Sequence, residues 1–286
     1  MNKAPVFAAG AALSLAIVAT AGSARAQAIP DSDWRQEDRH EAVLNAASPQ
    51  HFAFEVRFGT YSPNIDSAKE FQSLPAAKRP YAAVFGDHCP NADGSPCTAG
   101  ATHPKLYFGL EFDFLPVRIP WVGAIGIGLG WGFTNQSATS VFTAGPNVGQ
   151  ASGETTSLTI MPMHASIVLR ADEIMRRTGV PLVPYGKFGL SMDYWHASTD
   201  AGGEVFNKSS TVQIGANGFT PGLHMAVGGM LSLNFVDQRA SSRLDEATGV
   251  NHAYVFGEVY SDNVAFGTNV MQVGTMSWVA GLAIDM

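Results

Sequence analysis

The sequence predicts an all-β fold, an eight-stranded antiparallel up-and-down transmembrane β-barrel with short periplasmic helical turns. Three observations predict it: about eight stretches in which apolar and polar residues alternate, strands long enough to cross a bilayer, and a secretion signal before them. Alternation with a period of two indicates β-strands, because successive side chains point to opposite faces. In a membrane barrel the apolar face contacts lipid and the polar face fills the lumen.

Composition supports this class of protein. Charged residues make up 14% of the 286-residue chain, below the ~25% usual for soluble domains. No run of about 18 apolar residues follows the N-terminal region, so no transmembrane helix is expected in the exported chain. The net charge of −7 argues against nucleic acid as a partner, since nucleic-acid binding needs a basic face.

The N-terminus, residues 1–26, has the features of a signal peptide. Lys3 precedes the apolar run 6–20, and Ala24-Arg25-Ala26 is a small-residue cleavage site. An N-terminal transmembrane anchor is the alternative. Residues 27–50 are polar and charged, and we expect them to form a flexible periplasmic N-terminal segment.

The outer-membrane β-barrel domain is predicted over residues 51–286. The clearest strand is Lys105–Phe114, in which large apolar residues occupy every second position. The eight strands are expected at 51–60, 105–114, 121–133, 155–170, 181–195, 219–235, 251–260 and 274–286. The last strand ends on Met286, where outer-membrane barrels usually carry an aromatic residue.

The connections between the strands alternate in length. Those after the first, third, fifth and seventh strands are longer and polar, which is the asymmetry between outer loops and periplasmic turns in outer-membrane barrels. A Pro-containing turn is predicted at 115–120, and short helices are predicted at 172–178 and 237–249. The longer connections include 61–104, which carries a candidate short strand at 81–85, and the polar loops 134–154 and 196–218.

Both cysteines lie in the longest loop. Cys89 and Cys97 are close in sequence, and in an exported protein such a pair predicts a local disulfide. His88 and His103 flank the pair, so a zinc site is an alternative. Their spacing matches no standard zinc pattern, and no metal site is expected.

The polar faces of the strands carry charges that would point into the lumen. The expected lumen charge network comprises Glu55, Arg57, Glu111, Asp113, Lys187 and Asp193, with Asp285 also inward. Eight strands enclose a lumen that side chains just fill. Arg57 and Lys187 should therefore pair with the carboxylates, because an unpaired buried charge costs several kcal/mol.

One face of the third strand consists almost entirely of glycine from 124 to 132. It would leave room for the long charged side chains of neighbouring strands, or would permit strand curvature. An open diffusion pore is not expected. A soluble periplasmic β-protein is the alternative fold.

Several segments in order resemble a family of myxobacterial outer-membrane β-barrel proteins of uncharacterised function. They are Val-Arg-Phe-Gly-Thr-Tyr-Ser-Pro-Asn-Ile-Asp at 56–66, Pro-Tyr at 80–81, Leu-Glu-Phe-Asp at 110–113, Val-Pro-Tyr-Gly-Lys-Phe-Gly-Leu at 183–190 and the stretch at 243–258. The resemblance spans nearly the whole exported chain. It implies an outer-membrane barrel and brings no catalytic residues.

The first functional interpretation is a non-enzymatic barrel that anchors surface loops, with a structural or interaction role in the cell envelope. Its expected partners are outer-membrane lipid, lipopolysaccharide and an envelope or surface protein. The alternatives are a narrow solute channel and a lipid-A-modifying enzyme, an acyl hydrolase or transferase. For the enzyme, the catalytic candidates are His196, Ser198 and Asp200, because such a group can activate a hydroxyl. No cofactor is expected, since the glycine-rich stretch 123–130 lies within a strand and precedes no helix.

Overall fold

The computed structural model describes residues 51–69, 71–87, 98–141, 146, 151–199, 216–234, 250–263 and 271–286. The chain divides into two units, 1–46 and 47–286, and all described residues belong to the second. Several predicted features therefore lie outside the described residues: the signal peptide, the segment 27–50, His88, Cys89, Cys97, Asp200 and the helix at 237–249.

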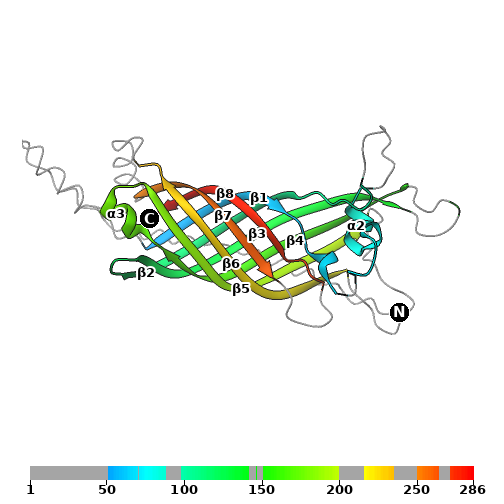
Figure 1. Ribbon diagram of the computed structural model, residues 1–286, viewed down its shortest axis with the longest axis horizontal. Coiled ribbons are helices and arrows are strands. Elements are labelled where there is room, and N and C mark those ends of the chain that lie inside the picture. The colour runs from blue at the N-terminus through cyan, green and yellow to red at the C-terminus, as the bar shows by residue number, and fades with distance from the viewer. Residues whose placement is uncertain are drawn as a thin grey trace, which may run out of the picture. The chain divides into compact units, whose positions relative to one another are not determined.

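Eight antiparallel strands form a closed barrel in which β1 pairs with β8 (Figure 1). The predicted eight-stranded up-and-down topology is confirmed. The strands are β1 (Phe52–Tyr61), β2 (Lys105–Ile119), β3 (Gly123–Val141), β4 (Ala151–Arg170), β5 (Leu182–Thr199), β6 (Asn217–Ser232), β7 (His252–Asn263) and β8 (Thr275–Asp285). The helical segments are η1 (Ile65–Ser67), η2 (Ala76–Lys78), α2 (Pro80–Phe85) and α3 (Asp172–Thr178). No helix in these described ranges is long and apolar enough to cross a membrane.

Five strands are longer than predicted: β2, β3, β4, β5 and β7. β2 continues to Ile119 through the expected turn, with a register shift between Phe114 and Val117. Pro116 falls in this shift, where its missing N–H removes no ladder hydrogen bond. β3 and β4 extend into the expected loop 134–154 and pair as far as Val141 and Ala151. The sequence did not reveal the extensions of β3 and β4, because Ser and Thr are as common in solvated strands as in loops.

The predicted short strand at 81–85 is wrong, because this segment forms α2. Pro80 stands at the first helical position, where its fixed φ suits a helix. The carboxylate of Asp66 accepts hydrogen bonds from the N–H groups of Tyr81 at 2.8 Å and Ala82 at 2.9 Å. These bonds satisfy two of the N–H groups that a helix start leaves without partners. The helix predicted at 172–178 is confirmed as α3 and ends at the left-handed Gly179.

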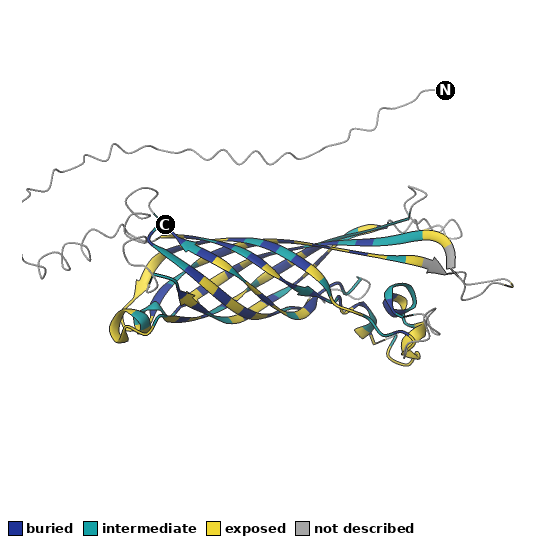
Figure 2. Ribbon diagram, turned by 90° about the horizontal axis from the view of Figure 1, so that it is seen from above, coloured by how far each residue is buried: buried dark blue, intermediate teal, exposed yellow. Residues whose placement is uncertain are grey.

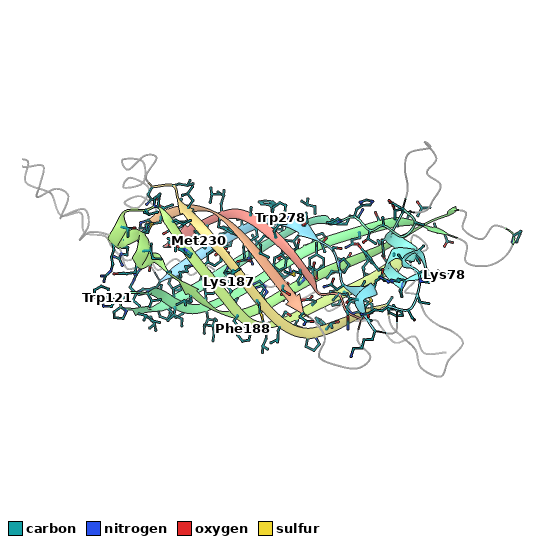
Figure 3. All side chains as sticks on the ribbon, viewed as in Figure 1. Lys78, Trp121, Lys187, Phe188, Met230 and Trp278 are labelled. Atoms are coloured by element: carbon teal, nitrogen blue, oxygen red, sulfur yellow. The ribbon has the colours of Figure 1, made fainter. Side chains whose placement is uncertain are left out.

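The two faces of each strand differ in burial, as the alternating colours along the barrel in Figure 2 show. All eight strands expose large apolar side chains on the outside; Phe188 and Trp278, labelled in Figure 3, are 53% and 54% exposed. Lys187 and Met230, on the other face of their strands, are buried in the lumen.

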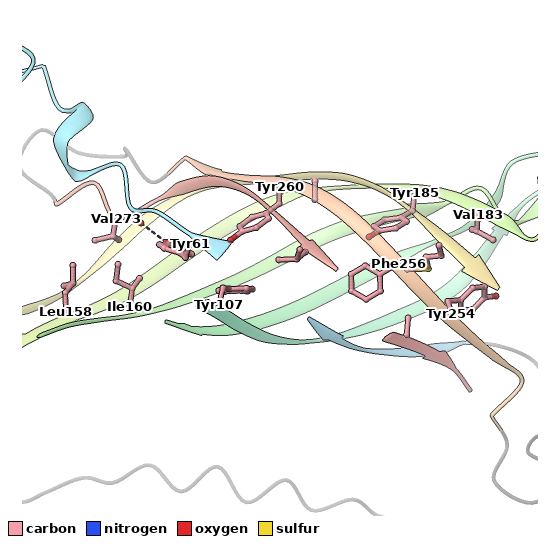
Figure 4. Packing of buried hydrophobic residues seen from close by; sticks show 14 of the residues in the cluster. Tyr61, Tyr107, Leu158, Ile160, Val183, Tyr185, Tyr254, Phe256, Tyr260 and Val273 are labelled. Carbon is pink, nitrogen blue, oxygen red and sulfur yellow. Dashed lines mark hydrogen bonds between the residues drawn. The ribbon is translucent and has the colours of Figure 1, made fainter. Parts of the chain in front are cut away.

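Apolar and aromatic side chains fill the lumen towards both ends (Figure 4). Tyr61, Leu158, Ile160 and Val273 belong to the end where β3 and β4 are extended. At the α3 end the corresponding residues are Val183, Tyr185, Tyr254, Phe256 and Met230. Charged side chains pack against several of these rings: Arg57 lies 5.9 Å from the centroid of Phe256 and Lys187 lies 5.1 Å from that of Tyr185.

Candidate functional site

The middle of the lumen holds a network of buried ion pairs. Arg57 on β1 places Nη1 2.6 Å from Oε2 of Glu111 on β2, and its Nη2 pairs with Glu258 on β7. Lys187 on β5 places Nζ 2.9 Å from carboxylate oxygens of both Glu55 and Glu111. It also lies 3.5 Å from Glu258. All five side chains are at most 3% exposed, so each cation offsets the large cost of burying a carboxylate.

Arg170 on β4 extends the network towards the α3 end. Its Nη2 lies 3.0 Å from Glu55 and 2.6 Å from Asp113, and its Nη1 lies 2.8 Å from Asp285. One guanidinium therefore connects β4 with β1, β2 and β8. The charge network expected from the sequence assigned Asp113 to Arg57 or Lys187, whereas the structure pairs it with Arg170.

Two histidines lie on the other side of the network. The rings of His164 on β4 and His224 on β6 stack with centroids 3.8 Å apart and planes 1° apart. His164 Nε2 is 3.4 Å from Glu111, and His224 Nδ1 is 2.6 Å from Asp262 on β7. These contacts continue the polar chain from the central carboxylates to β7.

Asp193 is the expected lumen charge that stands apart from the cations. It is fully buried, and its Oδ2 accepts a 3.4 Å hydrogen bond from the hydroxyl of Tyr61. That hydroxyl also donates to the carbonyl of Val273 at 2.7 Å, shown dashed in Figure 4. Among the described residues, no cation contacts Asp193, in contrast to Glu55, Glu111 and Asp113, the other three carboxylates of the predicted network.

The glycine face of β3 accommodates these side chains. A Cβ added at Gly128 would lie 2.6 Å from Asp113 Oδ1 and 2.8 Å from Glu111 Oε1. A Cβ at Gly130 would overlap the ring of His164. The expectation that these glycines make room for neighbouring polar side chains is confirmed.

Little space remains inside the barrel. A cavity of about 20 Å³ at the α3 end is bounded by Arg118, Arg170, Asp172 and Tyr254, which is room for about one water molecule. The hollow beside the stacked histidines does not admit a water molecule. Across the described part of the chain, no three His, Cys, Asp or Glu residues are placed to hold a metal ion.

The two described catalytic candidates lie on the outside of the barrel. His196 and Ser198 follow the lipid-facing Met192 and Tyr194 along β5, and both are partly exposed. The Ser198 hydroxyl lies 2.8 Å from the hydroxyl of Ser157, and no hydrogen bond joins it to His196. This pair therefore lacks the hydrogen bond from nucleophile to base that such catalysis needs.

The connection between β1 and β2 folds back over the end of the barrel opposite α3. We call its described residues, 62–69, 71–87 and 98–104, the cap. The Asn64 N–H donates to the Gly274 carbonyl at 2.8 Å, and Ser67 Oγ lies 3.0 Å from Gln272 Oε1. These bonds hold the start of the cap against the connection that enters β8.

Tyr81 attaches the cap to the extended part of β3. Its hydroxyl donates to Oε1 of Gln136, and its ring packs against Phe85 with centroids 5.2 Å apart. Burial raises the pKa of Tyr81 to about 12, although the hydrogen bond to Gln136 acts in the opposite direction. The phenol therefore stays protonated, and able to donate this bond, well above neutral pH.

Sequence reasoning missed three parts of the site. The expected charge network did not include Arg170 or Glu258, and Asp262 lies beyond the strand expected at 251–260. β7 mixes aromatic and acidic side chains on its inner face, and its alternation is therefore weak. The usable signal was the period-two spacing of Tyr254, Glu258 and Asp262, which places all three on one face.

No family model and no curated protein matches the sequence. The outer membrane protein OprG of Pseudomonas aeruginosa is similar in structure, with 12% identity, a TM-score of 0.38, and 83% of this chain and 96% of that chain covered. The attachment invasion locus protein Ail of Yersinia pestis is 8% identical, with a TM-score of 0.33, and the match covers 83% of this chain and 97% of that chain. A major outer membrane protein of Thermus thermophilus is 11% identical, with a TM-score of 0.34, and the match covers 82% of this chain and 99% of that chain.

At these TM-scores the fold assignment rests on the closed strand order of this chain itself. The exterior completes the argument, because each strand presents large apolar side chains to the outside. In lipid every backbone N–H and C=O must pair within the protein, and a closed sheet meets that requirement. A closed eight-stranded barrel with an apolar outside and a polar, filled inside is the architecture of an outer-membrane β-barrel.

Proposed function

We propose that the protein is a non-enzymatic barrel of the cell outer membrane that holds the cap at the cell surface, where the cap contacts an envelope or external partner. Buried side chains occupy the described part of the lumen, which argues against a solute channel, and the outward His196 and Ser198 share no hydrogen bond, which argues against the enzyme. The barrel then serves as an anchor, and the cap contacts the partner.

The orientation follows from the two ends of the barrel. At one end the described connections are the short turn between β2 and β3 and the segment that contains α3, while most of the connection between β6 and β7 lies outside the described residues; β1 begins and β8 ends at this end. Short connections are typical of the periplasmic side. The cap and the extended part of β3 and β4 then lie on the cell surface.

The observation that carries this proposal is that the cap is built against the barrel. Hydrogen bonds tie it to β3 through Gln136 and to the entry of β8 through Gly274 and Gln272. A connection that served only to join β1 to β2 would not need them. Many side chains of segment 71–80 remain exposed, which leaves them available to a partner.

The predicted disulfide fits this arrangement. The Asp87 N–H donates to the Ala101 carbonyl at 2.8 Å, and the Gly100 N–H donates to the Asp87 carbonyl at 2.9 Å. These bonds bring together the two flanks of the segment that contains Cys89 and Cys97. We propose that a Cys89–Cys97 bond closes this segment, which a mass shift on reduction and alkylation would test.

Membrane placement is tested by isolating outer membranes and comparing unheated with boiled samples on a detergent gel. A closed barrel stays folded without heating, so its band should shift after boiling. Recovery in the soluble periplasm without a shift would contradict the placement.

The role of the cap is tested by photo-crosslinking on whole cells. A photoreactive amino acid replaces Leu74, which is 38% exposed in the cap, and the matched control carries it at the lipid-facing Phe188. A discrete protein or glycan adduct at Leu74 and not at Phe188 supports the proposal. The role of the cap would be overturned if the barrel is in the outer membrane and shows the heat-dependent shift, yet gives no adduct at Leu74 or at other exposed cap positions.

A further inference from the structure

Trp121 stands in a turn position that normally requires glycine. The Val122 N–H donates to the Ile119 carbonyl at 3.2 Å, which closes a four-residue turn between β2 and β3. Pro120 is its second residue, and Trp121, the third, has φ of 70°. Pro followed by a left-handed residue is the pattern of a type II turn, whose third position favours Gly or Asn. Trp121 is the one residue other than glycine with positive φ in the described chain.

A bulky side chain at such a position calls for a reason, and packing does not supply it. Trp121 is 75% exposed and projects from the α3 end of the barrel, as Figure 3 shows. The guanidinium of Arg177 lies over its ring, 3.6 Å from the centroid. Arg118 on β2 bonds Asp172 of α3 at 2.8 Å, which fixes the helix beside the turn. The turn and α3 thus hold an indole and a cation together at the surface.

The surrounding surface is continuous with the lipid-facing wall of the barrel. Around Trp121 the exposed apolar side chains include Ile119, Val122, Ile174 and Val180. On β2 exposed apolar residues run from Leu106 to Ile119, which is about 30 Å along the barrel axis at ~3.3 Å per residue and a ~40° tilt. Such a length reaches the boundary between the hydrocarbon and the headgroups.

The charged side chains of Arg118 and of α3 carry one net positive charge. Arg177 donates from Nε to Glu173 at 2.7 Å, so its two Nη groups keep their hydrogens for another acceptor. Arg176 is exposed and has no carboxylate partner among the residues that the structure describes. Arg118 and Arg177 are balanced by Asp172 and Glu173, and Arg176 leaves one positive charge in excess.

We propose that Trp121, Arg176 and Arg177 bind the headgroup phosphate of an anionic phospholipid in the membrane leaflet at the α3 end. Guanidinium groups bind phosphate through paired N–H donors. An indole sits naturally at headgroup depth, with its apolar body towards the chains and its N–H towards water. The proposal rests on the membrane placement above and is independent of the surface role of the cap.

The test measures which lipids remain bound to the full exported chain. The protein is reconstituted in bilayers of equal phosphatidylethanolamine and phosphatidylglycerol, released into mild detergent, and weighed with its retained lipids by native mass spectrometry. The wild type should retain phosphatidylglycerol preferentially. Arg176→Gln with Arg177→Gln should lower that preference about fivefold per arginine.

Trp121→Gly separates binding from folding, because glycine suits the turn position better than tryptophan. This variant should keep the heat-dependent gel shift and lose phosphatidylglycerol preference. The matched controls are Lys69→Gln with Lys78→Gln, two exposed charges in the cap, and Trp278→Leu on the lipid-facing wall. Controls should match the wild type.

An unchanged lipid ratio in the double arginine variant or in Trp121→Gly would overturn the proposal. Equal loss in the cap control would also overturn it, because the preference would then reflect overall charge. Failure of this test leaves the crosslinking result at Leu74 unaffected, so the two proposals fail separately.

Discussion

Replacing Lys187 by Met tests whether the lumenal ion pairs hold the barrel together. Lys187 Nζ lies 2.9 Å from Glu55 and 2.9 Å from Glu111. At an effective dielectric constant of ~20, each contact is about 6 kcal/mol of gross attraction, most of which the desolvation of the ammonium offsets. The carboxylates keep Arg170 and Arg57 as partners. We therefore expect the loss in unfolding free energy to be about 3 kcal/mol, the lower end of the range for breaking a buried pair.

The assay is a urea titration of the reconstituted barrel, with the folded fraction read from the unheated gel band. Lys78→Gln serves as the exposed control, since Lys78 lies on the surface of the cap and its replacement should change the unfolding free energy by no more than about 0.5 kcal/mol. Adding Glu55→Gln to Lys187→Met should recover about 1 kcal/mol, because it removes one negative charge from a network that, without Lys187, holds more carboxylates than cations. A Lys187→Met midpoint equal to that of the control would refute the reasoning.

Three further predictions follow from the structure. Burial raises the pKa of Tyr81 from 10 to about 12, so its hydrogen bond to Gln136 is fully present below pH 10 and is lost as the pH rises through 12. Protease cleavage in the cap should therefore increase between pH 10 and 12. Tyr81→Phe should show faster cleavage already at neutral pH. His196→Ala and Ser198→Ala should leave the lipid A mass profile of an overexpressing strain identical to that of the wild type, since neither side chain has catalytic geometry, and an altered profile would restore the enzyme hypothesis. Planar bilayers containing the protein should show no stepwise solute conductance, because buried side chains such as Arg57, Lys187 and Ile160 occupy the described lumen; regular steps in the recordings would contradict this prediction.

The sequence predicted the strands well because a lipid-facing wall imposes strict alternation. Each outward position on β3 or β6 must be apolar, and the pattern is visible without knowledge of any partner strand. Ends of strands were predicted less well. Lipid no longer constrains β3 beyond Phe133, so the continuation from Thr134 to Val141 has no apolar signature.

The contacts within the lumen could be predicted only in part. Period two assigns a residue to the inside, but the axial position of an inward side chain depends on strand tilt and register, which one sequence does not specify. Arg170 illustrates this point, because it reaches carboxylates on β1, β2 and β8 that lie 57 to 115 positions away. α2 was missed for a different reason: the helix is stabilised by the distant Asp66, which local propensity does not include.

The charge network also explains how the barrel can select one register. A one-residue slip of β1 would turn its apolar residues inward, so contact with lipid alone excludes it. A two-residue slip keeps the apolar residues outside and the polar residues inside, so contact with lipid does not exclude it. A slip of two residues would move Arg57 towards the place of Glu55, beside Arg170 and Lys187, and would leave Glu111 and Glu258 without that cation. Three cations would then lie together in a site of low dielectric, at a cost of several kcal/mol. The apolar exterior therefore determines which face of each strand points outward, and the buried charges discriminate against the slips that the exterior would tolerate.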